Sequence, residues 1–223
     1  MSLPTPHPPP PPDAFILAGG QSTRMGRDKA LTLLAGVPLI QHACNLLRSV
    51  GLAPRIAGGQ SDLSAFAPSV PDDPSKAALG PLSGICSALG ATPSPFALFL
   101  PVDLPLLPSS LIRYLLRHAM VTQSAVTVVS VAGFIQTFPA VIAKAALSSL
   151  QLSLRSDDRN SLRAFRAAAQ HLSSPFSVLP LEVLLQAGQI PCPDALCSAS
   201  WFLNINTPQD LTRAEAQLTR MIK

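Results

Sequence analysis

The chain has 223 residues, of which 48% are hydrophobic, 13% are charged and 5% are aromatic. This length predicts one domain with a sizeable core, and no apolar run reaches the roughly 18 residues that span a bilayer. The net charge of +4 would suit nucleic acid, but the basic residues are dispersed and there is one Trp and one Tyr for stacking. We therefore expect no membrane segment and no nucleic-acid partner, and a basic surface that attracts small phosphorylated ligands.

The first residues are rich in proline. Residues 1–12 are expected to form a disordered or polyproline tail, because proline cannot continue a helix or an interior strand. A passive tail is favoured over a proline-rich motif for a partner. The tail lacks a cationic region followed by an apolar core, so we expect no secretory signal and a cytoplasmic protein. Residues 13–223 are then predicted to form a single domain.

Short apolar strands alternate with helical patterns along the rest of the chain. The first half predicts strands at 14–17, 55–57, 96–100 and 125–131, and helices at 38–50, 82–89 and 108–119. Beyond residue 148 the signals are weaker, with helices at 160–170 and 207–221 and strands around 176–179 and 201–205. The alternation predicts an α/β protein, a three-layer α/β/α sandwich with a mostly parallel sheet.

Four cysteines are present, and their spacing does not fit a zinc site. Disulfides are not expected in a cytoplasmic protein. We interpret all four as buried or incidental thiols: Cys44, Cys86, Cys192 and Cys197.

A glycine-rich loop follows the first predicted strand and runs from Leu17 to Lys29. Gly19 and Gly20 allow a ligand to approach main-chain N–H groups. Arg24 and Lys29 add the positive charge that a bound triphosphate requires. The spacing fits neither a P-loop nor the dinucleotide fingerprint, because no Gly-Lys-Ser/Thr ends the loop and a third glycine is missing at the proper place.

Asp103 follows the buried strand 96–100 and lies between Pro101 and Pro105. Ligands of open α/β sheets bind beyond the carboxyl ends of the strands. A carboxylate there suits Mg²⁺, which takes one or two carboxylates together with phosphate oxygens. The alternative is an aspartate that turns the chain or caps the next helix. Because the glycine-rich loop leaves another strand of the same predicted sheet, we favour the metal site.

These two features resemble the MobA-like nucleotidyltransferases, whose best-known members attach GMP to molybdopterin. The double glycine with Arg-Met-Gly and Asp-Lys is similar to the signature loop of that family, and Asp103 with Pro105 is similar to its Asp-x-Pro after a buried strand. The resemblance extends from about Ala14 to Leu218. It implies a Rossmann-like nucleotidyltransferase fold.

The resemblance also implies roles for the residues of these motifs. Asp103 would hold the metal and contact the nucleotide, and Arg24 and Lys29 would hold the departing pyrophosphate. Main-chain groups of the strand end and the double glycine would line the base and the phosphates, and they belong to Leu17, Ala18, Gly19 and Gly20.

Two further segments are similar to the family pattern. The pair Asp72-Asp73 precedes a Gly-Pro-Leu-x-Gly helix start at Gly80, so by that match Asp73 would contact the nucleotide; the alternative is a solvated loop. The segment 204–208 is similar to the closing Asn-x-Asn-Thr-Pro of the family. In a strand, Asn204 and Asn206 would share a face and bind the acceptor. The alternative is a helix start at Pro208 that Thr207 or Asn206 caps, and the two interpretations are compatible if Asn206 caps the helix while Asn204 faces the site.

Four arginines are spaced so that they would share one face of a helix over residues 155–166: Arg155, Arg159, Arg163 and Arg166. A solvated face is one interpretation. The other is that some of them, with Arg159 and Arg163 as the candidates, receive the phosphate of the acceptor, since planar guanidinium groups match phosphate oxygens.

The resemblance implies that the chain uses Mg²⁺ and GTP and transfers GMP to a molybdenum-bearing molybdopterin, with pyrophosphate as the second product. GTP is favoured because similar cytidylyltransferases have alanine at the place of Gly19. Cytidylyl or other nucleotidyl transfer to molybdopterin or a sugar phosphate is one alternative, and an inactive nucleotide-binding accessory module is another. The presence of Asp103 and Lys29 favours an enzyme. Proteins that deliver molybdopterin or mature molybdoenzymes are the implied protein partners.

Overall fold

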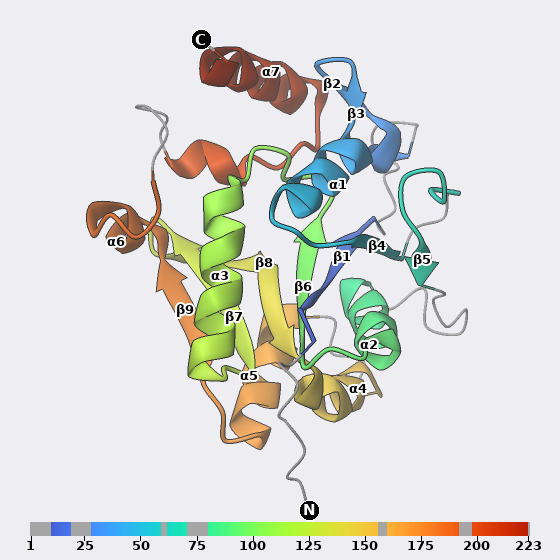
Figure 1. Cartoon of the computed structure of the whole chain (residues 1–223), viewed down its shortest axis with the longest axis vertical. Coiled ribbons are helices and arrows are strands. Elements are labelled where there is room, and N and C mark those ends of the chain that lie inside the picture. The colour runs from blue at the N-terminus through green and yellow to red at the C-terminus, as the bar shows by residue number, and fades with distance from the viewer. Residues whose placement is uncertain are drawn as a thin grey trace, which may run out of the picture.

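The computed structural model describes residues 10–18, 28–58, 62–70, 80–155, 160–191 and 198–222. At its centre is a seven-stranded sheet with helices on both faces, so the expected α/β/α sandwich is confirmed (Figure 1). The strands lie in the order β5-β4-β1-β6-β8-β7-β9. Their bounds are β1 Asp13–Leu17, β4 Pro54–Ala57, β5 Ser69–Val70, β6 Phe96–Pro101, β7 Val126–Val131, β8 Phe134–Ala143 and β9 Phe176–Pro180.

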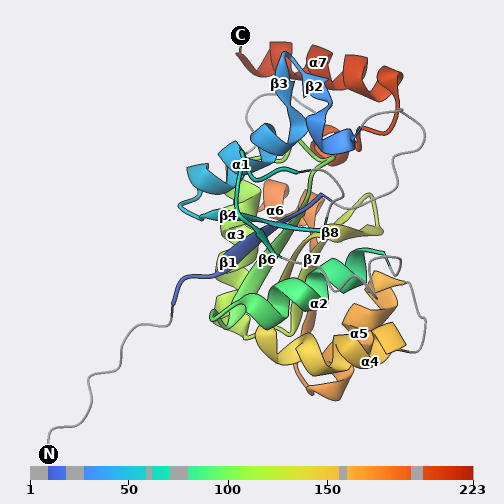
Figure 2. The same ribbon diagram turned by 90° about the vertical axis from the view of Figure 1, so that its right-hand side faces the viewer.

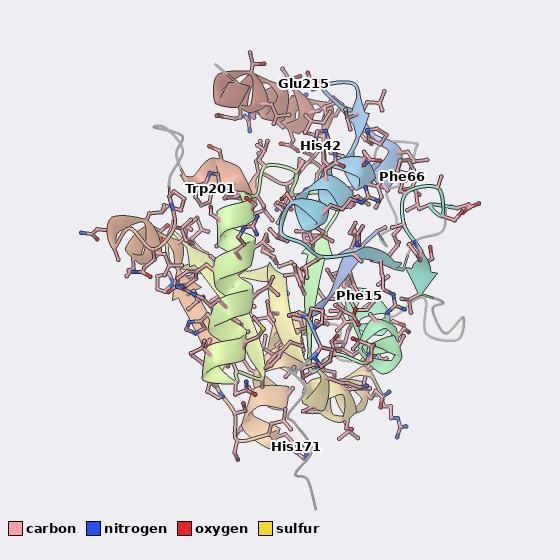
Figure 3. All side chains as sticks on the ribbon, in the orientation of Figure 1. Phe15, His42, Phe66, His171, Trp201 and Glu215 are labelled. Atoms are coloured by element: carbon pink, nitrogen blue, oxygen red, sulfur yellow. The ribbon has the colours of Figure 1, made fainter. Side chains whose placement is uncertain are left out.

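The sheet is mostly parallel, as expected. Strand β8 is the exception among the described strands, since it runs antiparallel to both of its neighbours, β6 and β7. The other neighbouring pairs are parallel. A separate short hairpin is formed by β2 (Leu33–Leu34) and β3 (Val37–Pro38). It lies beneath the C-terminal helix, where Glu215 accepts a 3.4 Å hydrogen bond from the N–H of Ala35 (Figure 3).

The helices divide between two apolar cores on either side of the sheet (Figure 2). The first core contains residues of α1 (Leu39–Ser49), α3 (Ser109–Thr122), α6 (Leu181–Gln186) and α7 (Pro208–Ile222). The second contains residues of α2 (Pro81–Ala91), α4 (Leu147–Arg155) and α5 (Ser161–His171). Short 3₁₀ helices occupy Lys29–Leu31, Lys144–Ala146 and Ser198–Phe202.

The central strands contribute side chains to both cores, because successive side chains of a strand point to opposite faces. In β1, Ile16 lies in the first core and Phe15 in the second. The neighbouring strand β6 repeats the pattern, and its Phe99 stacks on Phe15 with ring centroids 5.6 Å apart. Burial on both faces explains why these strands read as continuous apolar runs rather than as alternating ones.

Strand β8 and helices α4 and α6 are not predicted by the sequence patterns. Strand β8 contains Gln136, Thr137 and Pro139, and a proline argues against an interior strand because it cannot donate to the ladder. The strand expected around 201–205 is wrong, since residues 198–202 form a 3₁₀ helix and 203–206 have no regular structure.

The helix expected at 160–170 is confirmed as α5, whereas residues 155–166, whose helicity the shared arginine face required, do not form one helix. Helix α4 ends at Arg155, and α5 begins at Ser161. The side chain of Asn160 accepts a 3.0 Å hydrogen bond from the N–H of Arg163, which makes Asn160 the N-cap of a separate helix. Arg155 therefore belongs to α4, and Arg163 and Arg166 belong to α5, so these three arginines do not share one helical face.

The expected proline-rich tail lies mainly outside the described residues. Within them, the carbonyl of Pro11 accepts a 2.6 Å hydrogen bond from the hydroxyl of Ser94. Cys44 and Cys86 are buried, as predicted, and burial raises the pKa of the Cys44 thiol. Cys192 and Cys197 lie outside the described residues.

No helix in the described part is long and apolar enough to cross a membrane.

Candidate active site

The carboxyl ends of β1, β4 and β6 lie side by side at one edge of the sheet. The N–H of Ala18 donates to the carbonyl of Ala57 over 3.3 Å, and the N–H of Val102 donates to the carbonyl of Leu17 over 3.2 Å. The first residue of the glycine-rich loop after β1 and the residue before Asp103 are therefore tied to neighbouring strand ends. This is the arrangement in which ligands of open α/β sheets bind.

Lys29 lies at the end of the glycine-rich loop, in the first turn of the 3₁₀ helix Lys29–Leu31. Asp28 caps that helix, since its carboxylate accepts a 2.9 Å hydrogen bond from the N–H of Ala30. The cap was not recognised in the sequence, although aspartate is a preferred N-cap residue. It fixes the backbone from which the Lys29 side chain extends.

The ammonium group of Lys29 joins two segments that are distant in sequence. Its Nζ donates to Oδ2 of Asp103 over 2.7 Å and to Oδ1 of Asn206 over 2.6 Å. The side chains of Lys29 and Asp103 are 20% and 22% exposed, so the pair is open to a ligand from solvent. A cation, a carboxylate and a neutral amide thus meet at the carboxyl edge of the sheet.

A hydrogen bond to the Asp103 carbonyl and the burial of its neighbours in the chain together fix the position of Asp103. Its carbonyl accepts a 3.0 Å hydrogen bond from the N–H of Ile205, which joins the end of β6 to the segment before α7. Val102 and Leu104 are buried in the first core, as are Ile205 and Trp201, which lies near one end of α3 (Figure 3). Packing on both sides of Asp103 therefore fixes where its carboxylate emerges.

The start of α7 orients Asn206. The hydroxyl of Thr207 accepts from the N–H of Asp210 over 3.2 Å, while Oδ2 of Asp210 accepts from the N–H groups of Asn206 (3.1 Å) and Thr207 (2.9 Å). This reciprocal pattern is a capping box. The Thr207 hydroxyl also donates to Oδ2 of Asp210 over 2.8 Å. This hydrogen bond, and after it the one from the Asn206 backbone, holds the pKa of Asp210 below its usual value.

The capping box corrects the roles expected for the two asparagines. Of the two expected caps, Thr207 is confirmed and Asn206 is wrong, and it is Asn206 whose side chain reaches the site. Asn204 is exposed, and its segment is not a strand, so the two side chains are not placed by strand alternation. The sequence carried a usable signal for the cap, because a threonine followed three residues later by an acidic residue is typical of a helix start.

Helix α2 starts at the same edge. Gly80 precedes it with φ +78° and provides no side-chain cap, so the first N–H groups of the helix have no acceptor on an N-cap side chain. Nearby, Ser83 and Arg155 line a cavity of about 360 Å³ between α2 and α4. The hydroxyl of Ser83 is buried and has no hydrogen-bond partner in the structure described.

Several predicted site residues lie outside the described residues: Gly19, Gly20, Arg24, Asp73 and Arg159. Arg163 is described and lies in the first turn of α5, and the guanidinium of Arg166 lies 5.8 Å from the ring of Phe176. The structure thus brings together Lys29, Asp103 and Asn206, and places Leu17 and Ala18 at the adjoining strand end.

The donor set at this edge fits a hard cation that arrives with phosphate. The described residues contain no group of three or more His, Cys, Asp or Glu side chains that could hold a metal by themselves. Asp103 supplies one carboxylate, which suits Mg²⁺ because this ion keeps water or phosphate oxygens in most of its coordination positions.

Comparisons with known proteins identify the family of the chain. The family model described as MobA-like NTP transferase domain matches residues 14–173. A molybdenum cofactor guanylyltransferase from Rhizobium meliloti (strain 1021) is 34% identical over 93% of this chain and 92% of its own length. The protein of the same name from Shewanella amazonensis is 30% identical over 93% and 97%.

Solved structures support the fold. The molybdopterin-guanine dinucleotide biosynthesis protein A from Archaeoglobus fulgidus has a TM-score of 0.72 at 19% identity, over 93% of this chain and 99% of that one. The 2-C-methyl-D-erythritol 4-phosphate cytidylyltransferase from Thermus thermophilus has a TM-score of 0.64 at 17% identity, over 94% and 99%. At these identities the likeness concerns the fold alone.

Proposed function

Because the chain belongs to the family of MobA-like NTP transferases, we propose that it transfers GMP from GTP to molybdenum-bearing molybdopterin and releases pyrophosphate. The observation that carries the proposal is the contact of Lys29 with Asp103 and Asn206 at the carboxyl edge of the sheet. The two relatives named above as guanylyltransferases extend over nearly the whole chain, which favours GTP as the nucleotide.

In this reaction a phosphate oxygen of the acceptor attacks the α-phosphorus of GTP, and the bond between the α-phosphorus and the bridging oxygen breaks as pyrophosphate leaves. The acceptor supplies the nucleophile, so the protein positions the two substrates and neutralises charge. Lys29 binds phosphate oxygens of the nucleotide through its ammonium group. The backbone of Leu17 and Ala18 forms the adjoining wall of the site.

Asp103 would hold Mg²⁺ through its carboxylate. When bound, the ion supplies positive charge against the phosphate oxygens. The residues outside the described part keep their predicted roles: the resemblance implies nucleotide contacts for Gly19, Gly20, Arg24 and Asp73, and guanidinium chemistry favours Arg159 for the acceptor. Asn204 and Arg163 also remain predicted acceptor ligands. The cytoplasmic location and a protein partner that delivers molybdopterin remain predictions as well.

A calorimetric titration with GTP, CTP, ATP and UTP, each with and without Mg²⁺, tests the proposal. We expect selective binding of GTP that Mg²⁺ strengthens, followed by pyrophosphate release when molybdenum-bearing molybdopterin is added. A preference for CTP would replace guanylyl transfer by cytidylyl transfer. Binding of GTP without any pyrophosphate release in the presence of the acceptor would contradict an enzyme.

A further inference from the structure

We infer that Asn206 is a positioning residue for Lys29. The ammonium of Lys29 has two acceptors of different kinds in the structure: the charged carboxylate of Asp103 at 2.7 Å and the neutral amide oxygen of Asn206 at 2.6 Å. The amide is as close as the carboxylate, although Asn206 lies 177 residues away in the chain. Such a contact has to be built by the fold, and the fold holds Asn206 from both sides.

The backbone around Asn206 is fixed at two points. On its N-terminal side, Ile205 is buried and its N–H donates to the carbonyl of Asp103 over 3.0 Å. On its C-terminal side, the N–H of Asn206 itself donates to the carboxylate of Asp210 in the capping box of α7 over 3.1 Å. The side chain of Asn206 thus extends from a rigid segment that is tied directly to Asp103.

A neutral partner suits the task of Lys29. An ammonium group has three N–H donors, of which the contacts with Asp103 and Asn206 use two. An amide orients the ammonium without cancelling its charge, so the full positive charge stays available to a phosphate. If Asp103 held a cation that accompanies the nucleotide, Asn206 would keep Lys29 directed at the site.

This inference rests on the proposed nucleotide site. A double-mutant cycle tests the positioning role of Asn206 separately from the existence of that site. The affinity for GTP is measured with Mg²⁺ and without acceptor, in wild type, Asn206→Ala, Lys29→Ala and the double variant. We expect Asn206→Ala to weaken GTP binding about tenfold, the size of one hydrogen bond to a charged group. In the Lys29→Ala background the same substitution should change affinity by less than about twofold.

Asn206→Asp has the same size as asparagine and keeps the backbone bond to Asp210, which guards against a folding defect. It should also weaken GTP binding, because a carboxylate cancels the charge of Lys29. Gln209→Ala removes an exposed amide from the start of α7 and should leave GTP affinity unchanged. Equal losses from Asn206→Ala in both backgrounds would overturn the inference, as would unchanged GTP affinity with a raised KM for the acceptor. Absence of GTP binding in wild type would instead refute the proposed function.

A second, independent observation concerns the cavity between α2 and α4. Ser83, which is 2% exposed, lines this cavity of about 360 Å³, and its hydroxyl lacks a partner in the structure described. A buried hydroxyl without a partner is costly unless water or a ligand satisfies it. Arg155 is the charged residue of the lining, and Ser87 and Gln151 add further N–H or O–H donors. The geometry points to a binding site for a phosphoryl group.

Inorganic phosphate is the probe for this site, titrated by calorimetry into wild type, Ser83→Ala, Arg155→Gln and the control Arg117→Gln, which removes an exposed arginine of α3. We expect saturable binding that Ser83→Ala and Arg155→Gln each weaken about tenfold and that Arg117→Gln leaves unchanged. Loss of phosphate binding in the presence of saturating GTP and Mg²⁺ would identify a nucleotide phosphate as the natural occupant, and retention would identify a separate phosphoryl ligand. Absence of saturable binding, or binding that neither cavity variant weakens, would overturn the proposal.

Discussion

Lys29 and Asp103 form an ion pair with 2.7 Å between Nζ and Oδ2, across 74 residues of sequence. Both side chains are about one-fifth exposed, and partly exposed pairs of this kind contribute about 1 kcal/mol or less to stability. The pair therefore does little to hold the fold together. Substitution of either residue should report on ligand binding and chemistry rather than on folding.

Asp103→Asn tests the carboxylate. The substitution keeps an oxygen that can accept from Lys29 but removes the charge that would hold Mg²⁺. We expect turnover to fall by two or more orders of magnitude, which corresponds to about 2.7 kcal/mol or more in the barrier. Pyrophosphate release measures the rate, and thermal unfolding should show an unchanged fold. Rates near those of wild type, with Mg²⁺ still required, would remove Asp103 from this role.

Lys29→Ala tests the ammonium group. Loss of a charge-assisted contact with the triphosphate should weaken GTP binding by about 10- to 100-fold, measured by calorimetry. Lys144→Ala is the matched control, since Lys144 bonds to the carbonyl of Thr92 (2.6 Å), just after α2 ends. That variant should keep the GTP affinity of wild type. If Lys29→Ala also kept it, the glycine-rich loop would not be a triphosphate site.

The sequence predicted the part of the site that depends on strand ends. Asp103 follows the apolar run of β6, and the glycine-rich loop follows β1, and these strands are parallel neighbours. Carboxyl ends of adjacent parallel strands meet at one edge, so local sequence patterns were enough to predict that Lys29 and Asp103 lie close together.

The contact of Asn206 with Lys29 could not be predicted in the same way. It depends on how the segment before α7 packs against the end of β6, which is a tertiary relationship without a local signal. Strand alternation failed for Asn204 because that segment is irregular. The arginine stripe failed because the N-cap at Asn160 starts a new helix, a choice that helical spacing alone cannot reveal.

The two glycines of the α2 helix start should respond differently to alanine. Gly80 has φ +78° and ψ −163°, a conformation that is essentially restricted to glycine, so Gly80→Ala should destabilise the protein by about 1–3 kcal/mol. At Gly84 a Cβ would lie 3.7 Å from backbone atoms of Ala57 and Gly58, an ordinary contact. Gly84→Ala should match or exceed wild-type stability, because alanine favours a helix. Urea unfolding compares the two, and equal destabilisation would contradict this distinction.

The capping box of α7 should make the Asn206 segment sensitive to acid. Hydrogen bonds from the Thr207 side chain and the Asn206 backbone lower the pKa of Asp210 in the folded state. A lowered folded-state pKa means that the stabilisation is complete above the unfolded value of about 4 and is lost as the pH falls through the folded value. Hydrogen exchange of the N–H groups in this segment measures the loss of stabilisation, after correction for the intrinsic pH dependence of exchange.

The N–H groups of Asn206 and Thr207 should be protected at neutral pH and lose this protection below about pH 4. Asp210→Ala removes the acceptor and should abolish the protection at all pH values, whereas Glu215→Ala, on the same helix, should leave the pH profile unchanged. If the cap positions Asn206, Asp210→Ala should also weaken GTP binding in the same direction as Asn206→Ala. Protection of both N–H groups that persists in Asp210→Ala at neutral pH would show that the cap does not hold this segment.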